Sequence, residues 1–220
     1  MLNGFLNAFR VKELRSKILL TVGILVLYRI GAYVPVPGIP FQGMLSAYQS
    51  SSSANSAIAV LNLFSGGALS RVSVFCLGIM PYITAQIIMQ MFQAVIPSLG
   101  TLAREGESGQ RKITQYTRYL TVALALLNSV GYLFLFKSSS FGIDFSQAGM
   151  PGWLMDTVVV VSMLAGAILI MWMGEVITQR GIGNGMSLII FANIIAGLPT
   201  SIVQSLRTSD NGVLMTVMIV

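Results

Sequence analysis

The sequence contains no histidine, and only 9% of its 220 residues are charged. Without an imidazole there is no histidine metal ligand, no Ser–His or Cys–His catalytic pair and no imidazole proton switch. The single cysteine, Cys76, cannot form a disulfide within the chain. We interpret Cys76 as a small packing residue, and we expect no metal, no cofactor and no enzyme activity.

The charged residues are too few to solvate a soluble domain, because such domains carry about a quarter of them. Apolar residues make up 55% of the chain, which also excludes intrinsic disorder. A helix needs about 20 residues to span a bilayer, so the apolar content matches five or six spans. The sequence therefore predicts an integral membrane protein. Its thirteen basic residues, against seven acidic ones, are scattered at span ends and form no patch for nucleic acid.

The hydropathy pattern predicts an all-α, polytopic membrane bundle. An amphipathic segment, residues 1–17, precedes a five-span unit that extends over residues 18–212. A further apolar run, residues 213–220, reads as the beginning of a truncated sixth span, as in part of a longer protein. The five spans are expected at residues 18–36, 74–96, 119–136, 157–173 and 186–203.

Residues 61–75 are apolar but too short and too interrupted to be a span. They contain Ser65, Gly66 and Gly67, followed by Arg71. Broken backbone is tolerated at membrane depth only where it is buried in protein or lines a cavity. We therefore predict a re-entrant half-helix that leads directly into the second span, with Pro81 as a kink near the beginning of that span.

The charged loops predict the orientation in the membrane. Nine basic residues gather on one side of the predicted spans, whereas Lys137 and Arg207 lie on the other side. By the positive-inside rule, the N-terminus is expected in the cytoplasm. The nine residues are Arg10, Lys12, Arg15, Lys17, Arg104, Arg111, Lys112, Arg118 and Arg180. We interpret the last five of them as residues that hold this topology.

The glycine-rich stretch of residues 181–185 follows a predicted membrane helix rather than a strand. No acidic residue lies about 20 positions further on, which excludes a dinucleotide-binding loop. We predict a tight polar turn over residues 174–185, on the cytoplasmic side, in which Asn184 and Ser187 cap the fifth span.

Three stretches resemble the SecY family, the central subunit of the protein-conducting translocation channel. They are LNLFSGGALSR at residues 61–71, EGESGQRKITQYTRY at residues 105–119 and EVITQRGIGNG at residues 175–185. Shorter matches, YRIG at residues 28–31 and GIMPYI at residues 78–83, add to the resemblance, and the bacterial form fits best. The resemblance runs from about residue 14 to residue 204, in register with the predicted spans. It implies ten spans in two halves related by inverted pseudo-symmetry, of which this chain supplies the first half.

The resemblance assigns a hydrophobic pore ring to two of the spans. Its members here correspond to Ile79, Ile83, Met186 and Ile190, with Ile87 next to them. An apolar constriction blocks ions by dewetting and still admits a passing chain. The three isoleucines recur every four residues, on one face of a helix. Without the resemblance, isoleucine and methionine at this spacing would be read as plain packing.

The resemblance also assigns residues 62–75 to a plug that rests on the outer side of the ring. Gly66 and Gly67 would let its backbone bend, and Arg71 would orient it. A static filler loop is the alternative. The plug residues that carry the match are Asn62, Leu63, Phe64, Ser65, Gly66, Gly67, Ala68, Leu69, Ser70 and Arg71.

Thr84 falls at a lateral-gate position of the family, where a signal sequence passes between the second and seventh spans into lipid. Gln90 and Asn128 could form a polar contact with it. Polar contacts between membrane helices contribute only about 0.6–2 kcal/mol, so such a gate can open. For Asn128, simple interhelical bonding is the alternative.

The function implied is a passive channel in the bacterial plasma membrane, through which signal-bearing precursors are translocated or released sideways into the bilayer. The partners implied are the small subunits SecE and SecG, with the motor ATPase SecA or a ribosome, and no nucleic acid except through a bound ribosome. A secondary transporter with broken helices is the alternative, although it would need ionisable residues within its spans. An intramembrane protease would need a catalytic dyad that the sequence lacks.

Overall fold

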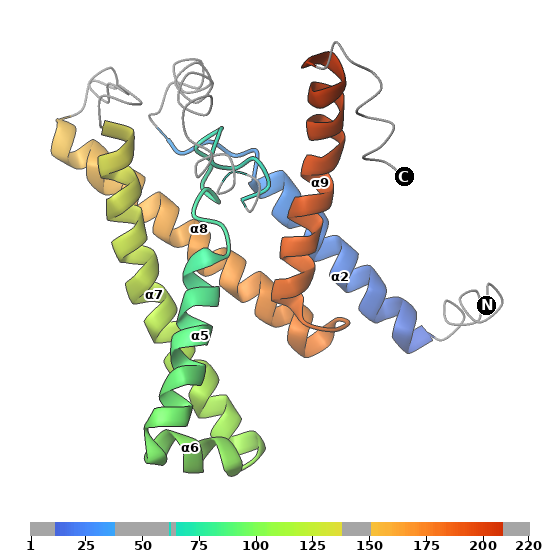
Figure 1. Ribbon diagram of the computed structural model, residues 1–220, viewed down its shortest axis with the longest axis vertical. Coiled ribbons are helices and arrows are strands. Elements are labelled where there is room, and N and C mark those ends of the chain that lie inside the picture. The colour runs from blue at the N-terminus through green and yellow to red at the C-terminus, as the bar shows by residue number, and fades with distance from the viewer. Residues whose placement is uncertain (1–11, 38–61, 63–64, 138–150, 209–220) are drawn as a thin grey trace.

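The computed structural model describes residues 12–37, 62, 65–137 and 151–208, with side chains described up to residue 197. These residues form an all-helical fold (Figure 1). The two ends of the predicted organisation, residues 1–11 and 213–220, lie outside the described residues. The helices are α2 (Lys12–Gly31), α5 (Met80–Val95), α6 (Pro97–Arg104), α7 (Glu107–Lys137), α8 (Gly152–Arg180) and α9 (Gly185–Thr208).

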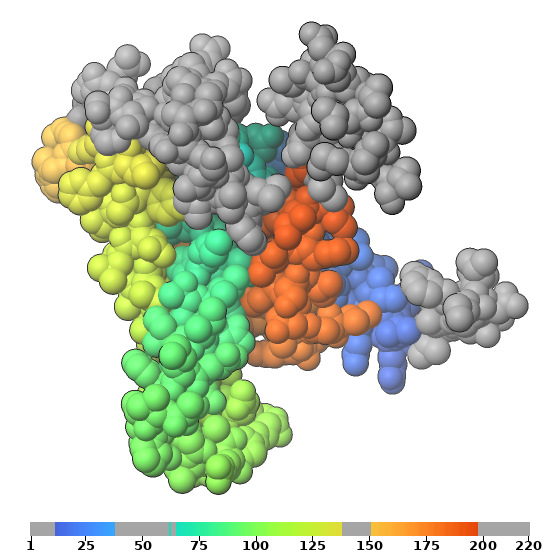
Figure 2. Space-filling model, viewed as in Figure 1, coloured from blue at the N-terminus to red at the C-terminus, as the bar shows by residue number. Residues whose placement is uncertain are grey.

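Helix α8 has a central place among the described helices, since three of the other four long helices pack on it (Figure 1). It packs on α7, α9 and α2, and α7 in turn packs along α5. The short helix α6 connects the end of α5 to the beginning of α7. Together with these two helix ends, α6 projects away from the remaining described residues (Figure 2). Each of the five predicted spans overlaps one of the long helices, in the predicted order.

Two of these helices, α7 and α8, are long and apolar enough to cross a membrane. Helices α5 and α6 would make a third span if they are counted as one broken helix, since they meet at an angle of 102°. Helix α2 carries charged residues at both ends, and the apolar part described for α9 ends at Gly197. The structure thus supports a helical membrane fold with two to three candidate spans, and the count of five stays a prediction.

The predicted half-helix is wrong over residues 65–75, although Asn62 is helical. Residues 65–79 form consecutive turns, with positive φ angles at Gly66, Gly67, Val72 and Gly78. An α-helix cannot contain such angles. Helix α5 begins only at Met80, with Pro81 in its first turn. Pro81 therefore opens the helix instead of kinking it, because a proline in the first turn has no N–H to leave unpaired.

The predicted boundaries of two other spans are also wrong. Helix α7 begins at Glu107 rather than at residue 119, and α8 continues to Arg180 rather than ending at residue 173. Helix α6 lies in the polar stretch between the second and third predicted spans. Hydropathy marks the part of a helix that lipid covers, and these helices continue as polar turns beyond it. The exposed pair Glu107–Arg111, four residues apart, is typical of such an end.

The turn between α8 and α9 is tight, as the sequence predicts, but it is shorter than the predicted residues 174–185. It covers residues 181–184, and the side-chain oxygen of Asn184 accepts a hydrogen bond of 3.0 Å from the N–H of Met186. The predicted capping role of Asn184 is confirmed.

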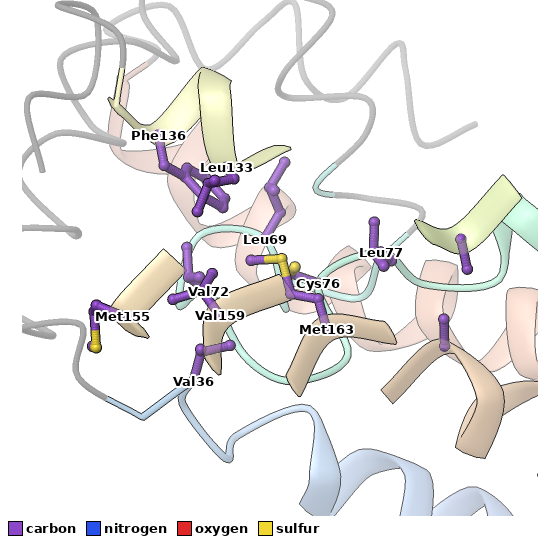
Figure 3. Close-up of a cluster of buried hydrophobic side chains, with 12 residues drawn as sticks. Val36, Leu69, Val72, Cys76, Leu77, Leu133, Phe136, Met155, Val159 and Met163 are labelled. Carbon is purple, nitrogen blue, oxygen red and sulfur yellow. The ribbon is translucent and has the colours of Figure 1, made fainter. Parts of the chain in front are cut away.

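A first cluster of buried apolar side chains lies where residues 65–79, the turn segment, meet α7 and α8 (Figure 3). Leu69, Val72 and Cys76 of the turn segment contribute to it, together with Phe136 of α7 and Val159 of α8. Cys76 is 2% exposed, which agrees with its interpretation as a packing residue. The turn segment therefore has a core of its own with the helices around it.

Two ion pairs set the register of α7 against α8. Lys137 pairs with Asp156 at 2.6 Å, and Arg118 pairs with Glu175 through contacts of 2.6 and 2.8 Å. The two pairs are nineteen residues apart on both helices, which is about 28 Å at 1.5 Å per residue. This distance matches the thickness of the hydrocarbon core, about 30 Å.

The turn segment approaches α8 midway between these ion pairs. Gly166 lies ten residues after Asp156 and nine before Glu175, and a Cβ atom at Gly166 would overlap the carbonyl of Val74. The absence of a side chain at Gly166 thus lets irregular backbone pack on α8 near mid-membrane depth.

Replacing Glu175 with glutamine should destabilise the protein by about 1.5 kcal/mol, because a charge-assisted hydrogen bond to Arg118 is lost. The Glu175 side chain is only 9% exposed, whereas Arg118 is 43% exposed. Because water reaches Arg118, the expected cost lies at the low end of the range for hydrogen bonds to charged groups. Arg111→Gln is the control, since its pair with Glu107 is fully hydrated. Thermal unfolding in detergent measures both, and equal shifts would contradict a structural role for the Arg118–Glu175 pair.

Replacing Gly166 with alanine should cost about 1–3 kcal/mol, because the new methyl group would overlap the Val74 carbonyl. Gly23→Ala is the matched control, since no atom lies within 4 Å of the Cβ position at Gly23 in helix α2. Alanine in a helix is favoured over glycine, so the control should stabilise the protein slightly. The yield of folded protein in detergent distinguishes the two, and a neutral Gly166→Ala would contradict the close approach.

Candidate functional site

Four of the five predicted ring residues belong to one buried apolar cluster. Ile79 and Met186 are buried at 2% and 5% exposure, and Ile83 and Ile190 pack against the same cluster. Ile79 is the residue just before α5, Ile83 lies in its first turn, and the other two lie on α9. Ile87 is 52% exposed and is not part of the cluster. The structure thus brings the tip of α5 and the beginning of α9 together through four of these side chains.

Two glycines bring Met186 to this position. A Cβ atom at Gly174 of α8 would overlap the Met186 sulfur, and one at Gly185 would overlap the carbonyl of Gly174. The N–H of Gly185 donates a hydrogen bond of 2.9 Å to the hydroxyl of Thr178. The beginning of α9 therefore lies directly against the end of α8.

The described part of the predicted plug is held together by its own polar groups. The side-chain oxygen of Asn62 accepts a hydrogen bond from the N–H of Ser70, and the carbonyl of Asn62 accepts one from the N–H of Gly67. The hydroxyl of Ser65 accepts a bond from the N–H of Leu69. These contacts replace the helical hydrogen bonds that the segment lacks. Leu63 and Phe64 lie outside the described residues.

The plug segment pairs with the extended chain that follows α2. The N–H of Val36 donates to the carbonyl of Val72, and the N–H of Val74 donates to the carbonyl of Val34, both over 3.0 Å. Arg71, which we expected to orient the plug, lies with its guanidinium 4.2 Å from the centre of the Tyr33 ring. The polar contacts to α2 and its extension were not evident from the sequence.

The three predicted gate residues are exposed and are not hydrogen-bonded to one another. The hydroxyl of Thr84 donates to the carbonyl of Met80 in its own helix, over 3.0 Å. Gln90 faces outward on α5, and Asn128 faces outward on α7. All three side chains are therefore accessible on the outside of the described helices.

Four of the five basic residues predicted to hold the topology are exposed, and the fifth, Arg118, is partly buried. Arg104, Arg111, Lys112 and Arg180 are exposed, whereas Arg118 forms the ion pair with Glu175. Sequence analysis placed Glu175 in a polar turn and missed this pair. Beside it lies a polar hollow of about 560 Å³, lined by Glu107, Gln110, Arg111, Thr114, Gln115, Arg118 and Gln179.

Within the described residues, no group of three or more cysteine, aspartate or glutamate side chains is placed to hold a metal ion. The chemistry available at the ring cluster is apolar contact. The plug adds backbone hydrogen bonds and the side chain of Arg71, and Arg29 of α2 lies beside it.

Known proteins with this sequence pattern are subunits of protein translocases. The chain is 45% identical over 206 residues to the translocase subunit SecY of Streptomyces coelicolor, covering 92% of this chain and 47% of the relative. It is 44% identical over 220 residues to the SecY subunit of Mycobacterium tuberculosis, covering 98% of this chain and 50% of the relative. The chain thus spans about half the length of these relatives.

Solved structures show the same fold. A protein-conducting channel matches with a TM-score of 0.54 and 22% identity, covering 83% of this chain and 37% of that chain. Sec61 in a canine ribosome–channel complex from the endoplasmic reticulum matches with the same values. The model of the SecY family matches residues 73–220. Because this match covers more than half of the chain, the protein belongs to the SecY family.

Proposed function

We propose that this chain works as the N-terminal half of a protein-conducting channel in the bacterial plasma membrane. It is a channel component and not an enzyme. The observation that carries the proposal is the shared cluster of Ile79, Ile83, Met186 and Ile190. Branched aliphatic and thioether side chains from two separate helices meet there, beside a non-helical segment. Such side chains can seal against ions and yet yield to a polypeptide, because apolar contacts are non-directional.

The second part of the proposal is that residues 62–75 act as the plug. In support, Ala68 and Phe75 belong to the same apolar cluster as Ile79 and Met186. The segment is compact through its own turns, so it could be displaced as a unit. A static filler loop would show the same packing at rest, and the experiments below separate the two roles.

The proposed orientation places the N-terminus and the α6 end in the cytoplasm. It is supported by nine basic residues on that side against two on the other. The spacing of the two ion pairs on α7 and α8 is compatible with a bilayer between them. On the cytoplasmic side we expect SecA or a ribosome to deliver precursors with signal sequences, while SecE and SecG clamp the assembly. Thr84, Gln90 and Asn128 would face the sideways exit into lipid.

Glu175 bears on the alternative of a secondary transporter. Such transporters use buried ionisable residues for coupling ions, and Glu175 is a buried acid within α8 that sequence analysis did not expect there. However, Arg118 contacts both carboxylate oxygens of Glu175. Glu175 also lies only five residues before the end of α8 at Arg180. A fixed ion pair near a helix end favours a structural role over ion coupling.

Cysteine crosslinking in the full-length protein that contains this chain tests the channel directly. With Cys76 replaced by serine, a single cysteine at Ile83 should form an adduct with a stalled secretory precursor that has a functional signal sequence. A cysteine at Val161, exposed on α8, is the control and should give no adduct. Adducts elsewhere on the protein but none at Ile83 would remove Ile83 from the pore and favour the transporter.

Replacing Ile83 with glycine should raise the resting ion conductance at least several-fold and relax the requirement for a good signal sequence, because the apolar constriction widens. Ile87→Gly is the matched control, since it makes the same change one helical turn further along α5, outside the cluster. Conductance of the purified channel in planar bilayers measures both. Equal conductance of the two variants would contradict the ring.

A further inference from the structure

A cation of helix α2 binds the backbone of the plug segment. Nη1 of Arg29 donates a hydrogen bond of 2.9 Å to the carbonyl oxygen of Gly66, which lies 37 residues further along the chain. Gly66 is buried and has a φ angle of +66°. Because the donor carries a charge, this bond belongs to the stronger class of hydrogen bonds in proteins.

Helix α9 encloses Gly66 from another direction. A Cβ atom at Gly66 would lie 2.5 Å from the side-chain oxygen of Asn193 and 2.9 Å from Nη1 of Arg29. The backbone of Gly66 therefore fits between α2 and α9 only because it has no side chain. Asn193, 1% exposed, also donates a hydrogen bond of 2.9 Å to the hydroxyl of Tyr28 on α2. The two helices that enclose Gly66 are thus bonded directly to each other.

Helix α2 holds the far end of the segment as well. The ring of Tyr28 stacks on the ring of Phe75, with centres 5.5 Å apart and planes 8° from parallel. A Cβ atom at Gly31 would overlap the Phe75 ring, so this glycine makes room for the stack. One helix therefore contacts the plug segment both at Gly66 and at Phe75.

The Arg29 bond can break without separating an ion pair. Among the described residues, no carboxylate lies within 4.0 Å of Arg29. Its guanidinium lies 5.9 Å from the centre of the Tyr33 ring, and the guanidinium of Arg71 lies over the same ring. Like charges so placed repel each other. The Gly66 carbonyl thus holds Arg29 through one directional and reversible contact.

We propose that Arg29 is the positioning residue that keeps the plug in its closed place, by holding the carbonyl of Gly66. This inference rests on the proposed function, since it takes residues 62–75 as a plug. The Asn193–Tyr28 bond keeps α9 and α2 together around Gly66, so that the carbonyl stays within reach of Arg29. Loss of the Arg29 bond removes a directional contact between α2 and this end of the segment.

The test compares Arg29→Gln with wild type in the full-length protein, reconstituted in planar bilayers without precursor. We expect the resting ion conductance to rise about tenfold, because loss of a hydrogen bond to a charged group shifts an equilibrium by at least that factor. Arg15→Gln is the matched control: the same change on the same helix, at an exposed position fourteen residues away. Its conductance should equal that of wild type.

Gly66→Ala provides a second, independent variant. Its methyl group would overlap both Nη1 of Arg29 and the side-chain oxygen of Asn193 without removing the charge, so it should raise the conductance at least as much. If Gly66→Ala already removes the Arg29 contact, the double variant should conduct about as much as Gly66→Ala alone. Should Arg29→Gln fail to reach the membrane, Gly66→Ala alone decides the question. Wild-type conductance in Gly66→Ala would overturn the proposal.

The two levels of inference fail in different ways. Wild-type conductance in both Arg29→Gln and Gly66→Ala, together with increased conductance in Ile83→Gly, overturns the role of Arg29 and leaves the ring in place. Wild-type conductance in all three, together with no precursor adduct at Ile83, overturns the proposed channel itself.

Discussion

The structure depends on one constraint: backbone N–H and C=O groups that lie at membrane depth must find partners within the protein. Helices meet this requirement by themselves, but residues 65–79 form turns and do not. The Val74 carbonyl reaches α8 at Gly166, midway between the two ion pairs that join α7 to α8. The rest of the arrangement can be understood as the set of partners that this non-helical segment needs.

Those partners come from three directions. The segment supplies some itself, through Asn62 and Ser65. The chain after α2 supplies a short pairing of Val34 and Val36 with residues 72–74, and α2 supplies the Arg29 side chain. Helices α7 and α8 supply apolar walls, in a register that two ion pairs fix. The segment is therefore embedded without being helical, held by a small number of directional hydrogen bonds and by an apolar core that it shares with α7 and α8.

Sequence predicted the presence and order of the five long helices, because each contains an apolar run. It did not predict their ends, since the polar turns of α7 before residue 119 look like a loop in hydropathy. The turn conformation of residues 65–79 could have been suspected from Gly66 and Gly67, but the positive φ of Val72 has no sequence signal. The Arg118–Glu175 pair joins residues 57 positions apart, and no local pattern announces such a contact. The ring residues came from resemblance, and the structure groups four of them; Ile87 lies two helical turns beyond Ile79 and points elsewhere.

The residues predicted for the ring and for the plug belong to one packed unit, since Ile79 and Met186 share a cluster with Ala68, Phe75 and Tyr28. Apolar contacts of this kind are non-directional, so they can seal in many arrangements and favour no single one strongly. In the proposed channel, the directional contacts select one resting position, with Arg29 at Gly66 and the backbone pairing of residues 34–36 with residues 72–74. The apolar cluster would then provide the barrier to ions, and the polar contacts would decide where the plug rests. A barrier built this way can be tight at rest and still open when a few polar contacts are lost.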